Sequence, residues 1–342
     1  MVDSRNNKVF GYSNNFFEAN DIIKIVAGLW RPGKDQPLWL RLLYFFYVGF
    51  MYFNGSVYFV CQYLIFDEML KDIPKLLSWF GMVLSLTLGL VKLGIFVFGQ
   101  KKVDKIIANL QHDDFKYASL DENGPGQMFL EEKRASRRVT FLVFCMYTCV
   151  GISAHISSSV VLHRQIPGDT FEGTNTTCYD YMPYFFLIPF STETKYDYYD
   201  GVFVGILKLF KIQLIIVSHV ISTIRQRSLI KLKMPENMEI MHDQECPELE
   251  NEMYCQLKHI IEHIQLLLGA QDDIEGLFTF VTLFQTLSSL FMFASCMYVA
   301  SIVPVSSSEF FAQIEFFISI LIQLFVICWA ANEITIANIL RK

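Results

Sequence analysis

Charged residues are scarce in this chain of 342 residues, since Asp, Glu, Lys and Arg make up only 18% of it. A soluble domain carries roughly a quarter, so the composition disfavours a soluble enzyme. Positive charge is not in excess either, because the formal net charge is −6. This balance argues against a protein that holds nucleic acid through phosphate contacts. The hydrophobic fraction of 53% excludes a disordered chain.

Patterns that carry enzyme chemistry are also missing. The sequence contains no P-loop, no GxGxxG, no GxSxG and no pair of catalytic carboxylates. Its eight cysteines form neither a CxxC metal pattern nor a disulfide framework. We therefore expect no enzymatic activity, no cofactor and no bound metal.

What the sequence does have is long apolar runs with few charges. A bilayer core requires about 20 consecutive apolar residues per helix. Runs of this kind cover residues 42–66, 76–100, 139–162, 201–224, 276–305 and 310–332. They predict an all-α fold, a polytopic membrane helical bundle with six spans, flanked by cytoplasmic segments at residues 1–41 and 333–342.

The distribution of Lys and Arg between the runs predicts the orientation of the bundle. Of the 28 basic residues, 21 lie in alternate segments beginning with the first, and only 4 lie in the segments between. Cytoplasmic loops retain positive charge, so the amino terminus is predicted to be cytoplasmic. The sequon at Asn175 falls in a segment predicted to be outside, where a glycan can be attached.

Three lysines lie inside the apolar runs, where a charge is costly. Lys92 comes late in the second run, and we expect its side chain to reach the interface beside Lys101 and Lys102. Lys208 and Lys211 share one helical face in the predicted outer half of the fourth run. Two interpretations stay open for this pair: contact with the membrane surface or the acidic outer loop, and a direct role in ligand binding.

Residues 259–263 read His-Ile-Ile-Glu-His, which fits the H-x-x-E-H pattern of zinc hydrolases. Such a site also requires a further ligand from a second element and an open coordination position. Neither can be assigned from the sequence. The polar face of an amphipathic cytoplasmic helix predicts the same residues, and we favour that interpretation.

Most of the chain resembles the insect odorant receptors, weakly before Leu38 and well from Leu257 onward. The resemblance is carried by residues 257–263 (LKHIIEH), 274–278 (IEGLF) and 283–290 (LFQTLSSL), and most clearly by 323–335 (QLFVICWAANEIT). Residues 182–190 are similar to the Pro-aromatic pattern before the fourth span of that family.

The resemblance implies an inverted topology with a cytoplasmic amino terminus in the plasma membrane of a sensory dendrite. It further implies a ligand-gated cation channel formed with a co-receptor subunit and opened by a small volatile ligand. The family's seventh span lines the pore, and the sequence to Lys342 provides six, so the expected pocket is better supported than the expected channel.

The family's ligand lies between the second, third, fourth and sixth spans, in the outer half of the membrane. A volatile molecule gains affinity mainly from buried apolar and aromatic contact. Reading the outer halves of those runs gives these candidates: Trp79 and Met82; Tyr147, Gly151, His155 and Ser158; Phe203, Leu207 and Phe210; and Phe316, Phe317 and Ile320. The alternative for each is a packing or lipid-facing residue.

Other classes of membrane protein remain as alternatives. A G-protein-coupled chemoreceptor requires an extracellular amino terminus, which the charge distribution opposes. A transporter could use Lys208 and Lys211 to recognise an anion, but internal repeats and broken helices are not visible in the sequence. A gustatory receptor of the same superfamily is the nearest alternative, and a membrane zinc hydrolase is the most distant.

Overall fold

The computed structural model describes residues 16–17, 36–64, 66–71, 73–120, 124–165, 193–235, 246–305 and 308–339. Within these ranges the protein is helical and has no strand. The helices are α2 (Leu38–Leu64), α3 (Phe66–Met69), α4 (Ile73–Leu110), the 3-10 helix η1 (Asp113–Phe115), α5 (Pro125–Gln165), α6 (Glu193–Ser222), α7 (Ile224–Lys231), α8 (Pro247–Ile302) and α9 (Ser308–Ile339). The expected all-α membrane bundle is confirmed.

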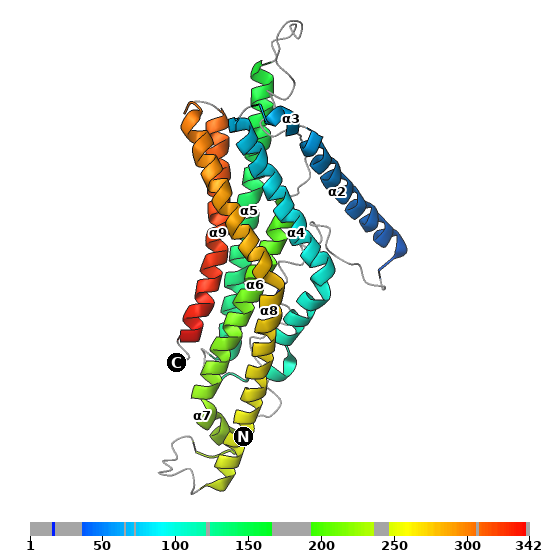
Figure 1. Cartoon of the computed structure of the whole chain (residues 1–342). Helices are drawn as coiled ribbons and strands as arrows, with labels where there is room; N and C mark the ends of the chain where they lie inside the picture. The colour runs from blue at the N-terminus through cyan, green and yellow to red at the C-terminus, as the bar shows by residue number, and fades with distance from the viewer. Residues whose placement is uncertain are drawn as a thin grey trace.

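Each predicted apolar run lies almost entirely in one long helix, but three helices continue well beyond their runs. The helix α4 extends to Leu110, α5 begins at Pro125 and α8 begins at Pro247. With 56 residues, α8 is about 84 Å long at 1.5 Å per residue, far more than a bilayer requires. The extensions lie on the side that the charge distribution assigns to the cytoplasm, and Figure 1 shows α8 reaching the end of the bundle beside α7.

The ends of α8 follow from its sequence. Pro247 occupies the first turn, followed by Glu248 and Glu250, which interact favourably with the positive end of the helix dipole. At the other end, Val303 is extended with φ −79° and ψ 139°. The next residue is Pro304, which disfavours a helical conformation in the residue before it. The sequence therefore sets both limits of this long helix.

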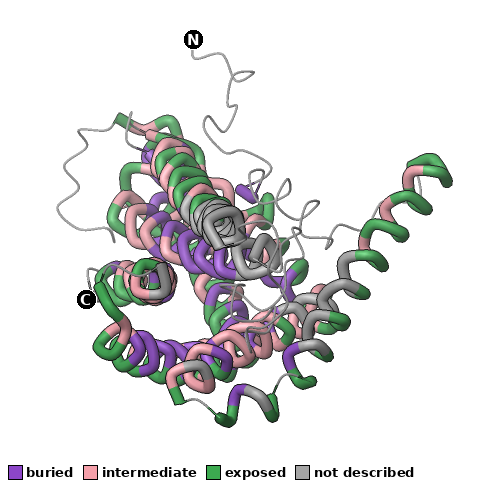
Figure 2. The backbone as a smooth tube through the Cα atoms, turned by 90° about the horizontal axis from the view of Figure 1, so that it is seen from above, coloured by how far each residue is buried: buried purple, intermediate pink, exposed green. Residues whose placement is uncertain are grey.

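The helix α6 lies at the centre of the bundle. It packs against α4, α5, α8 and α9, and every residue from 201 to 210 is buried. In Figure 2 the buried residues concentrate along the packed helices, whereas α2 leads away from them with mostly exposed or intermediate side chains. The helix α2 contacts only α3 and α4 among the described elements.

Three of the helices are long and apolar enough to cross a membrane by length and composition, within the residues that could be searched. The stretches are Asp200–Ser222, Pro247–Ile302 and Phe310–Ala337, and shorter apolar helices cover Leu38–Phe50 and Leu76–Lys92. The stretch in α6 is 83% buried, while those in α8 and α9 are only 33% and 28% buried. This difference fits lipid around the outer helices and protein around α6.

Candidate functional site

Part of the predicted site lies outside the described residues. Tyr147, Gly151, His155 and Ser158 are in α5, but their side chains are not among those the structure describes. The sequon at Asn175 also lies outside the described residues, as does the Pro-aromatic segment 182–190. The geometry of the site is therefore built from α4, α6, α8 and α9.

The candidates on α4 lie at the end of that helix nearest α2 and α3. The Trp79 indole Nε1 donates a hydrogen bond to the Gln62 carbonyl oxygen at 3.1 Å, and its ring lies 5.1 Å from that of Phe66. Trp79 is therefore buried against the junction of α2 and α3, with Met69 as its buried apolar neighbour. Met82 lies three residues further on and is half-buried.

The candidates on α9 lie where that helix approaches Gly81 of α4. A Cβ atom added at Gly81 would lie 4.0 Å from both Phe316 Cε1 and Met292 Cγ, so α4, α8 and α9 approach one another here. The rings of Phe317 and Phe293 are 5.0 Å apart. We use the name outer cluster for residues on α4, α8 and α9 in this part of the bundle: Trp79, Met82, Met292, Phe293, Phe316, Phe317 and Ile320. Within it Phe293 contacts Phe317, whereas Trp79 packs against Phe66 and Met69. The outer cluster has the aromatic and thioether side chains that suit a small apolar ligand.

The candidates on α6 lie elsewhere, in the main hydrophobic core. Phe203, Leu207 and Phe210 are buried, and the Phe203 ring lies 4.6 Å from that of Phe278 on α8. Phe278 comes at the cytoplasmic beginning of the predicted fifth run. The expectation that these three residues share the outer half of the bundle with Trp79 and Phe316 is therefore wrong.

The cause of that error is Asp200, which ended the apolar run but lies inside the bundle. Its side chain is 4% exposed, and its Oδ1 accepts a hydrogen bond from Lys92 Nζ at 2.7 Å. The other oxygen, Oδ2, accepts a hydrogen bond from Gln323 Nε2. Lys92, with a side chain 1% exposed, does not extend to the interface as expected. A buried charge remains charged when an opposite charge and further hydrogen bonds compensate its lost hydration.

We call Lys92, Asp200 and Gln323 the Asp200 triad. A narrow pocket adjoins this triad. The lining residues come from α5, α6 and α9: Val139, Thr140, Val143, Asp200, Gly201, Val204, Ile322, Gln323 and Val326. Its apolar interior has room for about one water molecule. Such a volume does not accommodate an odorant.

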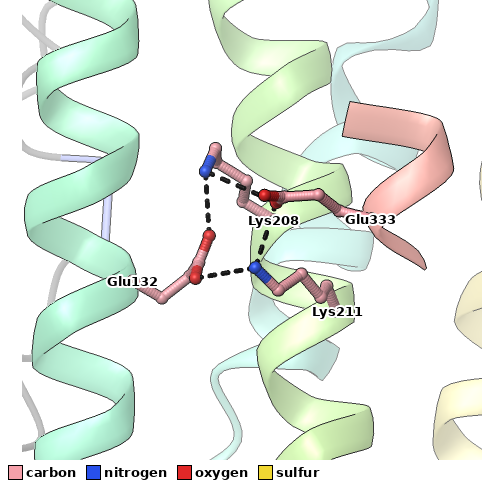
Figure 3. A network of polar contacts seen from close by, with 4 residues as sticks. All are labelled: Glu132, Lys208, Lys211 and Glu333. Carbon is pink, nitrogen blue, oxygen red and sulfur yellow. Dashed lines mark hydrogen bonds and ion pairs between the residues drawn. The ribbon is translucent and has the colours of Figure 1, made fainter. Parts of the chain in front are cut away.

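A second group of buried charges lies further along α6. Lys208 Nζ is 2.9 Å from Glu132 Oε1 and 3.8 Å from Glu333 Oε2. Lys211 Nζ is 3.0 Å from an oxygen of each glutamate. As Figure 3 shows, the two cations alternate with the two carboxylates between α5, α6 and α9. Lys208 Nζ also lies 4.8 Å from the ring centroid of Trp329, a cation–π contact.

This four-charge cluster corrects the predicted position of the two lysines. Glu132 precedes the third apolar run and Glu333 follows the sixth, so both belong to the ends assigned to the cytoplasm. Lys208 and Lys211 therefore lie at that end, rather than in the outer half beside the acidic outer loop. Because each cation is matched by a carboxylate, the cluster has no excess charge with which to recognise an anionic substrate.

The H-x-x-E-H pattern has a structural role in the cytoplasmic extension of α8. The Phe115 ring from η1 stacks on His263 with centroids 4.3 Å apart and on His259 at 5.2 Å. Tyr117 Oη lies 3.3 Å from His263 Nδ1. Burial lowers the pKa of His263 to about 4, with a smaller contribution from His259, so its ring is neutral at pH 7. The two histidines hold the segment between α4 and α5, and no group of three metal-ligating side chains occurs among the described residues.

Comparison with known proteins agrees with this architecture. The family described as 7tm Odorant receptor matches residues 72–338, more than three quarters of the chain. The chain belongs to this odorant receptor family. No curated protein matches it significantly. The family assignment supports a chemosensory receptor in a membrane.

Several residues that shape this odorant receptor were missed by sequence reasoning. Asp200 and Glu333 were treated as boundaries of the apolar runs, Glu132 was left in the cytoplasmic segment before the third run, and Gln323 was noted only as part of a family pattern. One signal was available: three lysines in apolar runs require buried acceptors. Acidic residues at the run boundaries are the nearest source of them. Which acid meets which lysine depends on how the helices pack.

Proposed function

We propose that this odorant receptor is the ligand-binding subunit of a heteromeric cation channel. It assembles with a co-receptor subunit in the plasma membrane of a sensory dendrite and is opened by a small volatile molecule. The observation that carries the proposal is the family match over residues 72–338. It is supported by the aromatic contact of Phe293 with Phe317 and by the close approach of Met292 and Phe316 to Gly81 of α4.

The ligand site that we propose is centred on Trp79, Met82, Phe316, Phe317 and Ile320. Apolar contact supplies most of the affinity for a volatile, so few polar groups are required. Tyr147, Gly151, His155 and Ser158 of α5 remain proposed contacts. Phe203, Leu207 and Phe210 influence the response through the packing of α6 and not by touching the ligand. A bound molecule shifts the closed-to-open equilibrium only if it contacts the two states differently.

The test is co-expression of the receptor with a co-receptor subunit and measurement of currents evoked by a panel of volatile alcohols, esters and aromatics. We expect Phe316→Ala to raise the half-maximal concentration of an active odorant by about tenfold, equivalent to roughly 1.4 kcal/mol of lost contact. The control is Phe325→Ala on the same helix, where the side chain is 64% exposed. Equal dose–response curves for the two variants would remove this site.

The membrane orientation has its own test, which does not depend on a ligand. An amino-terminal epitope tag should be detected only after cells are permeabilised, and enzymatic deglycosylation should shift the protein through Asn175. A tag detected on intact cells would contradict the inverted topology and with it the proposed channel assembly.

A further inference from the structure

Three helices of the bundle meet at one buried carboxylate. Asp200 on α6 receives Lys92 from α4 through one oxygen and Gln323 from α9 through the other. Lys92 and Asp200 are separated by 108 positions in the sequence, and Asp200 and Gln323 by 123. The contact is therefore a tertiary junction of helices distant in sequence, and both carboxylate oxygens are used in it.

The two helices that reach Asp200, α4 and α9, also carry most of the outer cluster, whose remaining members are Met292 and Phe293 of α8. Phe316 and Gln323 are seven residues apart, two turns of α9, and so lie on the same face of that helix. Met82 precedes Lys92 by ten residues, about 15 Å along α4. Nearer the outer end, Gln313 Nε2 donates a hydrogen bond to Ser78 Oγ at 3.2 Å. A change in the separation of α4 and α9 at the outer cluster thus alters both contacts to Asp200.

We propose that the Asp200 triad holds the ligand-free arrangement of α4, α6 and α9 and transmits ligand binding from the outer cluster to α6. This inference rests on the proposed receptor function and adds positioning residues to it: Lys92, Asp200 and Gln323 do not touch the ligand. The triad acts as a switch because its members are buried. A lysine or an aspartate that loses its partner there is left buried and uncompensated, which is strongly destabilising, so intermediate separations are disfavoured.

The narrow pocket beside Asp200 gives the carboxylate an alternative partner. Asp200, Gly201 and Gln323 line it together with Val139, Thr140 and Val143 of α5. When the Lys92 and Gln323 side chains withdraw, the Asp200 carboxylate and the Thr140 hydroxyl are the two polar partners for a water molecule in this otherwise apolar space. The second arrangement is then accessible at a moderate free-energy difference, as a ligand-driven transition requires.

The first experiment compares two neutralised pairs in the full receptor co-expressed with a co-receptor subunit. Lys92→Met/Asp200→Asn removes both charges of the triad and so leaves no unpaired buried ion. Lys105→Met/Asp273→Asn is the control, because this pair is likewise an ion pair between α4 and another helix. Lys105 Nζ lies 3.0 Å from Asp273 Oδ2 on α8, but the two side chains are 63% and 29% exposed. We expect the first variant to raise the leak current roughly tenfold and lower the half-maximal odorant concentration. The control should match the wild type.

Gln323→Leu removes one of the two partners of Asp200 and leaves Lys92 as the other. Its leak current should lie between those of the wild type and Lys92→Met/Asp200→Asn. Surface biotinylation normalises every current to the amount of receptor in the plasma membrane. A responsive wild type with equal normalised leak in the triad variant and the control would overturn the inference while leaving the proposed function intact.

A second readout requires no ligand. Amide hydrogen exchange of the purified full chain in lipid nanodiscs should increase around Lys92, Asp200 and Gln323 together in the triad variant, and not in the control. An increase confined to one helix, or the same in both variants, would overturn the inference. If no volatile activates the wild type, the proposed function fails on that result. The exchange data then decide on their own whether the triad couples the three helices.

Discussion

The helices α2 and α6 are both rich in apolar residues, yet the fold places them in opposite surroundings. Every residue from 201 to 210 of α6 is buried, whereas Phe45 and Phe46 of α2 are 72% and 73% exposed. The helix α6 also holds buried polar groups, among them Asp200, Lys208 and Gln213. Protein packing allows these groups to be paired, which lipid does not. Polar residues in an apolar helix thus mark the central position.

Among the substitutions that distinguish α6 from α2, the largest loss of stability is expected at Lys208. Lys208→Met on α6 should lower the free energy of unfolding by about 3–5 kcal/mol, because Glu132 and Glu333 would then share Lys211 alone. Thermal unfolding of the receptor in nanodiscs measures the loss. Adding Glu132→Gln to this variant should restore part of it, since one carboxylate then remains for one lysine. A single variant as stable as the wild type would contradict the account of the four-charge cluster.

The next largest difference between α6 and α2 is expected in the stability cost of replacing a large apolar side chain by alanine. Ile206 is fully buried, and Ile206→Ala should cost about 2–5 kcal/mol through the cavity it leaves. Phe45→Ala on α2 removes a larger side chain but should cost less than about 1 kcal/mol, because lipid fills the space without loss of packing. The two midpoints are compared in the same nanodisc preparation. Similar shifts would mean that α2 packs against protein in the membrane.

Lowering the pH should destabilise the cytoplasmic extension of α8, because His263 is buried there in its neutral form. Burial lowers the pKa of His263 from 6.5 to about 4 in the folded protein. Between pH 4 and pH 6.5 this histidine is therefore protonated in the unfolded chain and neutral in the folded protein. Stability from this group is therefore complete above pH 6.5 and decreases as the pH falls towards 4. His263→Phe should flatten this dependence and retain the stacking with Phe115. Hydrogen exchange in the segment 113–118 at pH 7 and pH 5 measures the difference.

The smallest effect is expected at the exposed pair of Lys105 and Asp273. Lys105→Met should change the free energy of unfolding by less than about 1 kcal/mol, since solvent screens the charges and the side chains already carry water. The effect should diminish further at high salt. A loss comparable to that of Lys208→Met would show that exposure is a poor guide to the contribution of charges in this bundle.

The sequence was sufficient for the helices themselves. Six apolar runs predicted six long helices because hydrogen bonding of the backbone within each segment is required in a bilayer. Caps and breakers such as Pro247 and Pro304 explain the limits of α8. The family resemblance rested on residues 257–335, and the family match over residues 72–338 confirms it.

The relative depth of the helices could not be read from the sequence. A charged residue was taken to end a span, and for Asp67 or Lys101 nothing in the structure opposes this. For Asp200 the rule failed, because the residue is buried and paired with a lysine 108 positions away. The shift of α6 towards the cytoplasmic end moved Phe203, Leu207 and Phe210 away from the outer cluster.

Local chemistry thus determined which segments of this receptor are helical, which family it resembles and which lysines lie inside apolar runs. Only the tertiary structure decided that Lys92 meets Asp200, that Lys208 and Lys211 meet Glu132 and Glu333, and that His263 packs against Phe115 and Tyr117. The physical reason is that hydrogen bonding and hydrophobicity along a helix are properties of neighbouring residues. The compensation of a buried charge depends on residues that become neighbours only when the helices pack.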